Sequence, residues 1–112
     1  MLEAHKRWIE TKGDSGSRAV LAKTMLKGAY LQGAMLRGAD LREADLREAE
    51  LQNADLFLAD LRGAEMHEAK LFGAVLKRAK LDKASLIRVN LVQVDMSEVS
   101  MAGADFREAD MR

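Results

Sequence analysis

Residues 39 to 63 read ADLRE ADLRE AELQN ADLFL ADLRG, so this stretch repeats itself every five residues. A period of five does not fit an α-helix, in which steps of five rotate around the axis. It does not fit a flat strand either, because an odd step changes the face to which the side chain points. The repeat therefore predicts a third backbone geometry.

The repeat continues without a change of register from Ala19 to Arg112, and we call its middle apolar residue the centre. The centre is Leu, Met or Phe in all nineteen repeats, and the residue two places before it is Ala in fifteen of them. The residue before the centre and the two residues after it hold nearly all of the charge and six of the eight Gly.

This division of positions indicates which side chains point inwards. Two residues that are two positions apart on an extended segment point to one face, so the Ala and the centre share the interior. The two residues after the centre must then turn the chain, and Gly suits a corner that in places needs a positive φ. A chain of this kind closes into a coil, and its coils stack about 4.8 Å apart. We expect an all-β solenoid.

These residues resemble the pentapeptide repeat family, whose consensus is Ala, then Asp or Asn, then Leu, then two variable residues. The resemblance implies a right-handed quadrilateral β-helix with four repeats in each coil. Nineteen repeats would then make about 4.75 coils, roughly 23 Å long. The segments that match the consensus directly are 39–43, 44–48, 54–58, 59–63, 104–108 and 109–112. The residue before the centre departs from it at Val20, Met25, Tyr30, Met35, Lys70, Val75 and Lys80.

Four sides of five residues should place each residue beside the one twenty positions later. Residues 40 to 68 carry nine acids and three Arg, whereas residues 69 to 88 carry six Lys or Arg and one Asp. An acidic coil should therefore lie against a basic one, although Asp40 and Asp60 would form a like-charge pair. The opposite charges that this register brings together are Glu50 with Lys70, Asp60 with Lys80, Arg62 with Asp82, and Glu68 with Arg88.

Residues 1–18 do not follow the repeat and form a separate unit from the β-helix of residues 19–112. Leu2, His5, Trp8 and Ile9 recur at helical spacing, and Gly13 is a stop signal. We expect a short N-terminal α-helix and loop that cap the first coil, as end caps do in stacked repeats. The alternative role for His5 and Trp8 is a ligand pocket.

The last coil has larger and more adaptable centres than the others, namely Met96, Met101, Phe106 and Met111. The repeats reach Arg112 with no cap after them, and the resemblance implies dimerisation at this end. We therefore predict a homodimer joined through the C-terminal coil. The alternatives are that Phe106 and Met111 plug the end, or that the natural chain continues beyond it.

The sequence predicts no catalytic residue, no metal site and no cofactor. It has no Cys, its two His (His5 and His67) are far apart, and its carboxylates occupy outward positions at fixed intervals. The Gly are spaced by the corners and form no phosphate-binding loop. No run of 18 apolar residues and no signal-peptide pattern is present, so we expect a cytoplasmic protein that is not bound to a membrane.

The outward positions hold a few apolar residues that form a candidate partner patch: Phe57, Leu58, Phe72, Val75 and Val92. The alternative is that these are the scattered apolar residues normal on any surface. We therefore expect a structural or protein-interaction module with an unknown partner.

The second function class comes from the resemblance, because some members of the family imitate duplex DNA and bind DNA gyrase or topoisomerase IV. Charge disfavours this alternative. From Val20 on, the outward residues of the four sides sum to +1, −2, 0 and 0, so no side carries a continuous negative stripe. Nucleic-acid binding is not expected either, because the basic residues of 69–88 surround a single coil.

Overall fold

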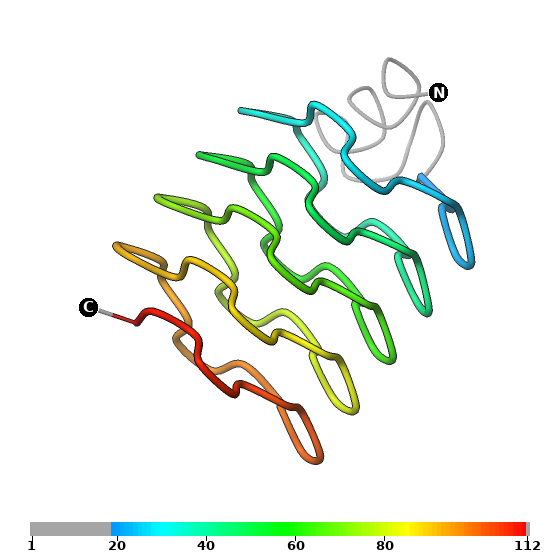
Figure 1. The fold of residues 1–112 in the computed structure, drawn as a ribbon. Coiled ribbons are helices and arrows are strands. Elements are labelled where there is room, and N and C mark those ends of the chain that lie inside the picture. Colours follow the sequence, from blue (N-terminus) through cyan, green and yellow to red (C-terminus); the bar gives the residue numbers. More distant parts are fainter. Residues whose placement is uncertain (1–18, 112) are drawn as a thin grey trace.

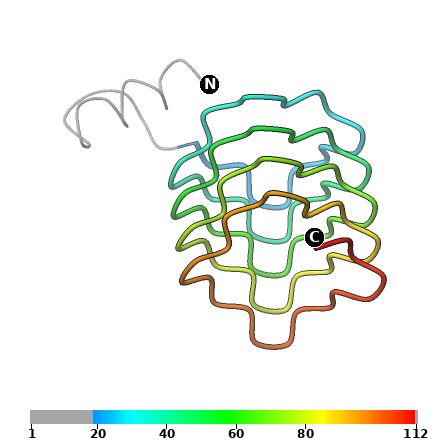
Figure 2. The ribbon, with the colours of Figure 1, turned by 90° about the vertical axis from the view of Figure 1, so that its left-hand side faces the viewer.

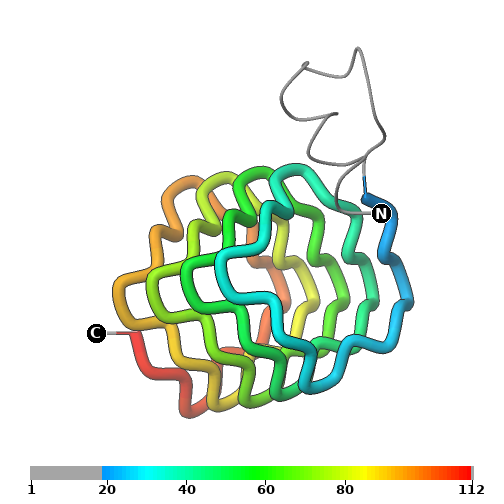
Figure 3. The backbone as a smooth tube through the Cα atoms, turned by 90° about the horizontal axis from the view of Figure 1, so that it is seen from above, coloured from blue at the N-terminus to red at the C-terminus, as the bar shows by residue number. Residues whose placement is uncertain are grey.

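The computed structural model describes residues 19–111, which form a right-handed quadrilateral β-helix. The coils stack along one axis, and the last coil, drawn in red, lies at the opposite end of the stack from the first, drawn in blue (Figure 1, Figure 2). Figure 3 shows that successive coils share one outline. The predicted cap residues Leu2, His5, Trp8 and Ile9 lie outside the described residues.

The β-structure consists of single-residue bridges. Every bridge within residues 19–111 is parallel and joins two residues that are twenty positions apart, from Val20 with Asp40 to Asn90 with Asp110. The bridging residue is always the one before a centre. No helix and no longer strand occurs in this part of the chain. The predicted register of twenty residues per coil is confirmed.

Backbone hydrogen bonds connect each repeat to the coils on both sides of it. The N–H of Asp55 donates to the carbonyl of Ala34 in the preceding coil at 2.9 Å. The N–H of Leu56 donates to the carbonyl of Val75 in the following coil at 2.8 Å. The same bonds recur along the stack, so most backbone N–H groups of an inner coil are satisfied without any strand longer than one residue.

Each corner is a β-turn closed by a hydrogen bond from the next Ala to the centre, as from Ala59 to Leu56 at 2.9 Å. The second residue after the centre has a positive φ at every corner from Lys23 to Glu108, and twelve of these residues are not Gly. A positive φ at this position alone defines a type II turn. The sequence predicted positive φ in places, but all corners need it. A left-handed backbone costs a residue other than Gly about 1–2 kcal/mol, so most corners are strained.

The interior is formed by the centres and by the residues two places before them, as predicted, and Val89 is a fully buried exception to Ala at the second position. The leucine side chains of the inner coils are completely inaccessible to water, and burying one such side chain contributes about 1.5–3 kcal/mol. The fully buried large side chains are Leu36, Leu41, Leu46, Leu51, Leu56, Leu61, Met66, Leu71, Leu76, Leu81 and Leu86. The interior is therefore packed along its length and has no room for a ligand.

Leu56→Ala should lower the free energy of unfolding by about 2–5 kcal/mol, because it leaves a cavity that the neighbouring coils fill only in part. The matched control is Leu58→Ala, two residues later on the same coil, where the side chain is 47% exposed. This control should change the free energy by no more than about 0.5 kcal/mol. Urea denaturation followed by circular dichroism measures both, and equal losses would contradict the inward and outward assignment.

Candidate interaction surface

The Asp or Asn before a centre caps the turn that follows it. Asp55 Oδ1 accepts a hydrogen bond from the backbone N–H of Phe57 at 3.1 Å. This N–H, one residue after the centre, is the backbone donor that neither the ladder nor the turn uses. The sequence analysis missed this role, although Asp two residues before a free N–H is the signal for an Asx-turn. The same cap is made by Asp40, Asp45, Asp60, Asn90, Asp95 and Asp105.

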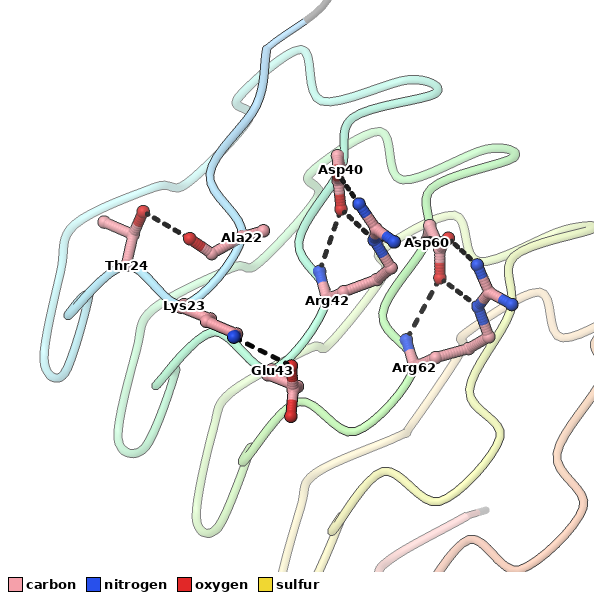
Figure 4. Close-up of polar contacts among 8 residues, drawn as sticks. All are labelled: Ala22, Lys23, Thr24, Asp40, Arg42, Glu43, Asp60 and Arg62. Atoms are coloured by element: carbon pink, nitrogen blue, oxygen red, sulfur yellow. Dashed lines mark hydrogen bonds and ion pairs between the residues drawn. The ribbon is translucent and has the colours of Figure 1, made fainter.

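In four repeats an Arg two residues after the Asp binds the same carboxylate with a two-pronged contact. Arg47 Nε donates to Asp45 Oδ1 at 2.8 Å and Arg47 Nη2 donates to Asp45 Oδ2 at 2.7 Å. These hydrogen bonds lower the pKa of Asp45 from 3.8 to about 2. The same fork is made by Arg42 on Asp40 and Arg62 on Asp60, both drawn in Figure 4, and by Arg107 on Asp105.

The four predicted pairs of opposite charges are adjacent in the stack, and one of them forms a close ion pair. Arg88 Nη1 lies 3.8 Å from Glu68 Oε1. The other three pairs confirm the register, but their charged groups do not approach within 4 Å: Glu50 with Lys70, Asp60 with Lys80, and Arg62 with Asp82. Pairs at the same spacing that were not predicted are Lys23 with Glu43, Arg78 with Glu98, and Arg88 with Glu108.

Other hydrogen-bond partners hold these three acids. Asp60 is already held by Arg62 in its own repeat. Glu50 Oε1 accepts a hydrogen bond from Gln32 Nε2 of the preceding coil at 3.2 Å, and Asp82 accepts one from the hydroxyl of Ser100 of the following coil. For Asp60, the partner two residues away is fixed by the turn, and so it outcompetes a flexible Lys on the next coil.

The basic coil of residues 69–88 has lysines that form no close ion pair, although the charge of Lys80 acts on Asp60 and that of Lys77 on Asp95. Its two arginines pair with glutamates of neighbouring coils. Its four lysines have no ion-pair partner within 4 Å among the residues that the structure describes: Lys70, Lys77, Lys80 and Lys83. These lysines project from a coil that also carries part of the predicted partner patch.

The predicted patch residues lie on one side of the helix and at its two corners. We call Phe57, Leu58, Phe72, Val75 and Val92 the corner band. Leu58 and Phe72 are 47% and 40% exposed, and the other three are half-buried. The bands of neighbouring coils meet at one corner, where the N–H of Gly73, next to Phe72, donates to the carbonyl of Val92 at 3.1 Å.

The register also brings the two ends of the corner band towards each other. A side chain one place after a centre reaches the residue eighteen positions later, as Arg37 Nη2 reaches Asp55 Oδ2 at 3.0 Å. The same offset places Phe57 beside Val75. The guanidinium of Arg37 also lies over the ring of Phe57, 5.0 Å from its centroid. The structure thus joins residues that the sequence could only place on adjacent corners.

A second apolar feature surrounds the first coil and was not predicted as a site. The residue before the centre is apolar on all four sides there, and these residues are exposed by 38 to 79%. Elsewhere in residues 19–111 only Val75 is apolar at this position. The four residues are Val20, Met25, Tyr30 and Met35.

The predicted dimer residues lie at the last described coil. Met101 and Met111 are 41% and 61% exposed, whereas Met96 and Phe106 are half-buried against the core. Every inner centre is fully buried by comparison. The last layer of the interior is therefore the least covered part of the core among residues 19–111.

The hollows on the described surface are open to solvent. One of them is a groove between coils whose two arginines are already bound to Asp. Residues 19–111 contain no group of three His, Cys, Asp or Glu that could hold a metal ion. Within the same residues, no helix has the length and apolar character needed to cross a membrane. The groove is lined by Arg42, Glu43, Arg62, Gly63, Lys80, Asp82, Lys83 and Ser100.

Proteins built from the same repeat are similar to this chain in sequence and in structure. The family model described as pentapeptide repeats matches residues 24–63, 39–78 and 74–112. A pentapeptide repeat protein from the Arabidopsis thaliana thylakoid lumen is 32% identical, with a TM-score of 0.79 over 82% of this chain and 64% of that chain. The pentapeptide repeat protein Rfr23 from the cyanobacterium Cyanothece 51142 is 31% identical, with a TM-score of 0.51 over 85% of this chain and 62% of that one. This chain spans less than two thirds of either, and no curated protein matches it.

Asp45→Asn should weaken the loss of stability in acid, because the variant keeps the turn cap but lacks the carboxylate. The pKa of Asp45 is about 2 when folded and 3.8 without its partners, so its contribution is complete above pH 3.8 and disappears as the pH falls towards 2. Denaturant midpoints between pH 6 and 2 measure this effect. The variant should be less stable than wild type at pH 6 and should decline less. Glu48→Gln is the control, because Glu48 has no ion-pair partner among the described residues, and a similar change in it would contradict the assignment.

Proposed function

The chain belongs to the pentapeptide repeat family, and from that premise we propose that it is a non-enzymatic module that binds another protein through the corner band. The observation that carries this proposal is Leu58. It has a φ of 61° and is 47% exposed. It is the only apolar side chain, of any size, among the eighteen corner residues that have a positive φ.

Leu58 carries two costs that folding does not require. The left-handed backbone disfavours any side chain with a Cβ, and water disfavours the exposed apolar surface. Gly would remove both costs, and Gly occupies the same position at six other corners. A role in binding supplies the benefit that the fold alone lacks, since a partner would cover the side chain. Phe72, which is 40% exposed on the same band, supports this view.

The absence of catalysis is part of the same proposal. Catalysis needs a cavity in which titratable groups are held near a substrate. The interior of this helix is filled by Ala and Leu, and the carboxylates of Asp40, Asp45, Asp60 and Asp105 are bound to Arg and to backbone N–H groups. These groups are suited to holding turns rather than to moving protons.

A homodimer joined through the C-terminal coil is the second element of the proposal. Along the helix, the N–H of each centre and the carbonyl two residues before it point towards the following coil. At the last coil these groups belong to centres such as Phe106 and to residues such as Ala104. In an antiparallel pairing of two copies, the N–H of one copy meets the carbonyl of the other, so the edge is self-complementary, as a two-fold interface requires.

The alternative, a DNA mimic that binds gyrase or topoisomerase IV, has less support. A mimic needs a long surface of unpaired negative charge. Here three of the nine acids of residues 40 to 68 are bound to Arg in their own repeats, three more lie within 4 Å of an Arg of another coil, and the following coil is basic.

A photo-reactive phenylalanine analogue in place of Phe72 should cross-link a partner protein in cells of the source organism. The matched control is the same analogue in place of Ile87, which occupies the equivalent position at the adjacent corner away from the corner band. The adduct should disappear when Leu58→Gly is added, because the variant removes the apolar contact and relieves the corner. Adducts that are the same at both positions, or no adduct at Phe72, would contradict the proposal.

Light scattering should give the mass of a dimer for the wild type and of a monomer for Phe106→Arg. The variant places a charge in the apolar end layer, where a second copy would bury it without a partner. Phe57→Arg is the control, because it adds the same charge on a side of the helix. A wild-type monomer, or a dimer that persists in Phe106→Arg, would place any assembly elsewhere.

A further inference from the structure

We propose that the partner of the corner band is an acidic amphipathic helix of another protein, whose apolar side chains cover the band and whose carboxylates meet the lysines around it. This inference rests on the proposed function and adds the chemistry of the partner. It follows from the cations that surround the band, from the reason that they are unpaired, and from the spacing of the coils.

Each inner residue of the band is bracketed by two cations. Along the helix axis, Phe57 lies between Arg37 in the preceding coil and Lys77 in the following coil, since each is twenty residues away. Around the coil, Val75 lies between Lys70 and Lys80, which occupy the same position on the two adjoining sides. Along the axis, Val75 lies between Asp55 and Asp95, each of which caps its own turn. The band is therefore an apolar strip whose borders carry four cations and two acids that already accept hydrogen bonds from their own repeats.

Three of these cations are available to a partner. Lys70, Lys77 and Lys80 have no ion pair within 4 Å among the described residues, whereas Arg37 is bound to Asp55 at 3.0 Å. These lysines form no close pair because acids such as Asp60 bind other groups, as the fork of Arg62 shows, although the charge of Lys80 still acts on Asp60 and that of Lys77 on Asp95. A lysine ammonium is strongly hydrated and contributes to binding when it meets a carboxylate at an apolar border.

The spacing favours a helical partner over an extended one. Phe57 and Lys77 are one coil apart along the axis, which is about 4.8 Å. On one face of an α-helix, residues three or four apart are separated by about 5–6 Å. Alternate residues of a strand are separated by about 6.6 Å and lose register over two coils. A helix that runs along the axis can thus place an apolar residue on Phe57 and an acidic one on Lys77.

An acidic protein segment fits this surface better than a nucleic acid or a membrane. A phosphate backbone would meet the lysines but would leave the exposed faces of Leu58 and Phe72 uncovered. A membrane would need a broad apolar face, whereas the acids Asp55 and Glu98 lie beside this narrow strip. Both remain as outcomes of the test below.

The test uses fluorescence anisotropy of labelled 21-residue helical peptides with the intact 112-residue protein. The first peptide has Leu on one face and Glu at its borders, the second has Lys in place of Glu, and the third has Ser in place of Leu. A duplex DNA of 20 base pairs and anionic vesicles of phosphatidylglycerol are the other probes. Only the Leu and Glu peptide should bind, and added salt should weaken its binding.

Two variants locate the binding on the corner band. Leu58→Gly should weaken the Leu and Glu peptide by about tenfold or more, as expected for a central apolar contact. It should fold at least as well as wild type, because Gly suits a φ of 61°. The double variant Lys70→Gln with Lys77→Gln should weaken binding by about fivefold and reduce its dependence on salt. Glu48→Gly, a corner on the opposite side of the helix, should bind as wild type does.

Each other outcome overturns the inference. If the Leu and Lys peptide bound with equal affinity, the lysines of the protein would not contribute to recognition. If the Ser and Glu peptide, the DNA or the vesicles bound, the apolar corner band would not be the recognition surface. Failure of all peptides together with an adduct at Phe72 would reject the acidic helix and leave the proposed function in place. Failure of all peptides with no adduct would reject both.

Discussion

The corner with a positive φ is the constraint on which the rest of the structure depends. A coil of twenty residues closes only because each of its four corners turns the chain with the same two residues and in the same conformation. If one corner used an additional residue, every later centre would leave the interior, because the five-residue spacing determines which residues point inwards. The bond from Ala59 to Leu56 is one of the turn bonds that enforce this count. Core, ladder and surface register all follow from it.

The sequence predicted the parts of the structure that depend on counting. The centres, the inward Ala and the spacing of twenty between neighbours all follow from a period of five, and the structure confirms them. The sequence did not predict that a residue such as Glu48 adopts a φ of 59°. Most residue types at that position are not typical of a left-handed backbone. It also did not predict which cation a carboxylate binds. The repeat places both Arg62 and Lys80 near Asp60. Only the geometry of the turn determines that Arg62 binds its carboxylate.

The sequence predicted which residues belong to the candidate site, but it did not predict how their side chains are directed towards one another. Position in the repeat identifies Phe57 and Phe72 as outward residues, yet the offset of eighteen that brings Phe57 beside Val75 is a property of side-chain direction. The pairs that reveal it, such as Arg37 with Asp55, are visible only in the structure. The same holds for the apolar residues before the centres of the first coil. Their pattern is visible in the sequence, but the exposed fraction of their side chains is visible only in the structure.

The local satisfaction of acids has a consequence for the whole surface. A chain with equal numbers of acidic and basic residues could neutralise itself by pairing one coil with the next. Here, in four repeats, the Asp before the centre caps its own turn and an Arg two residues later binds the same carboxylate, as at Asp45. Within residues 19–111, such an acid does not form an ion pair with a cation of the next coil. Repeats without this arrangement, including those of Lys70 and Lys80, keep their charge. Turn chemistry therefore decides where net charge appears on this helix, and it appears around the corner band.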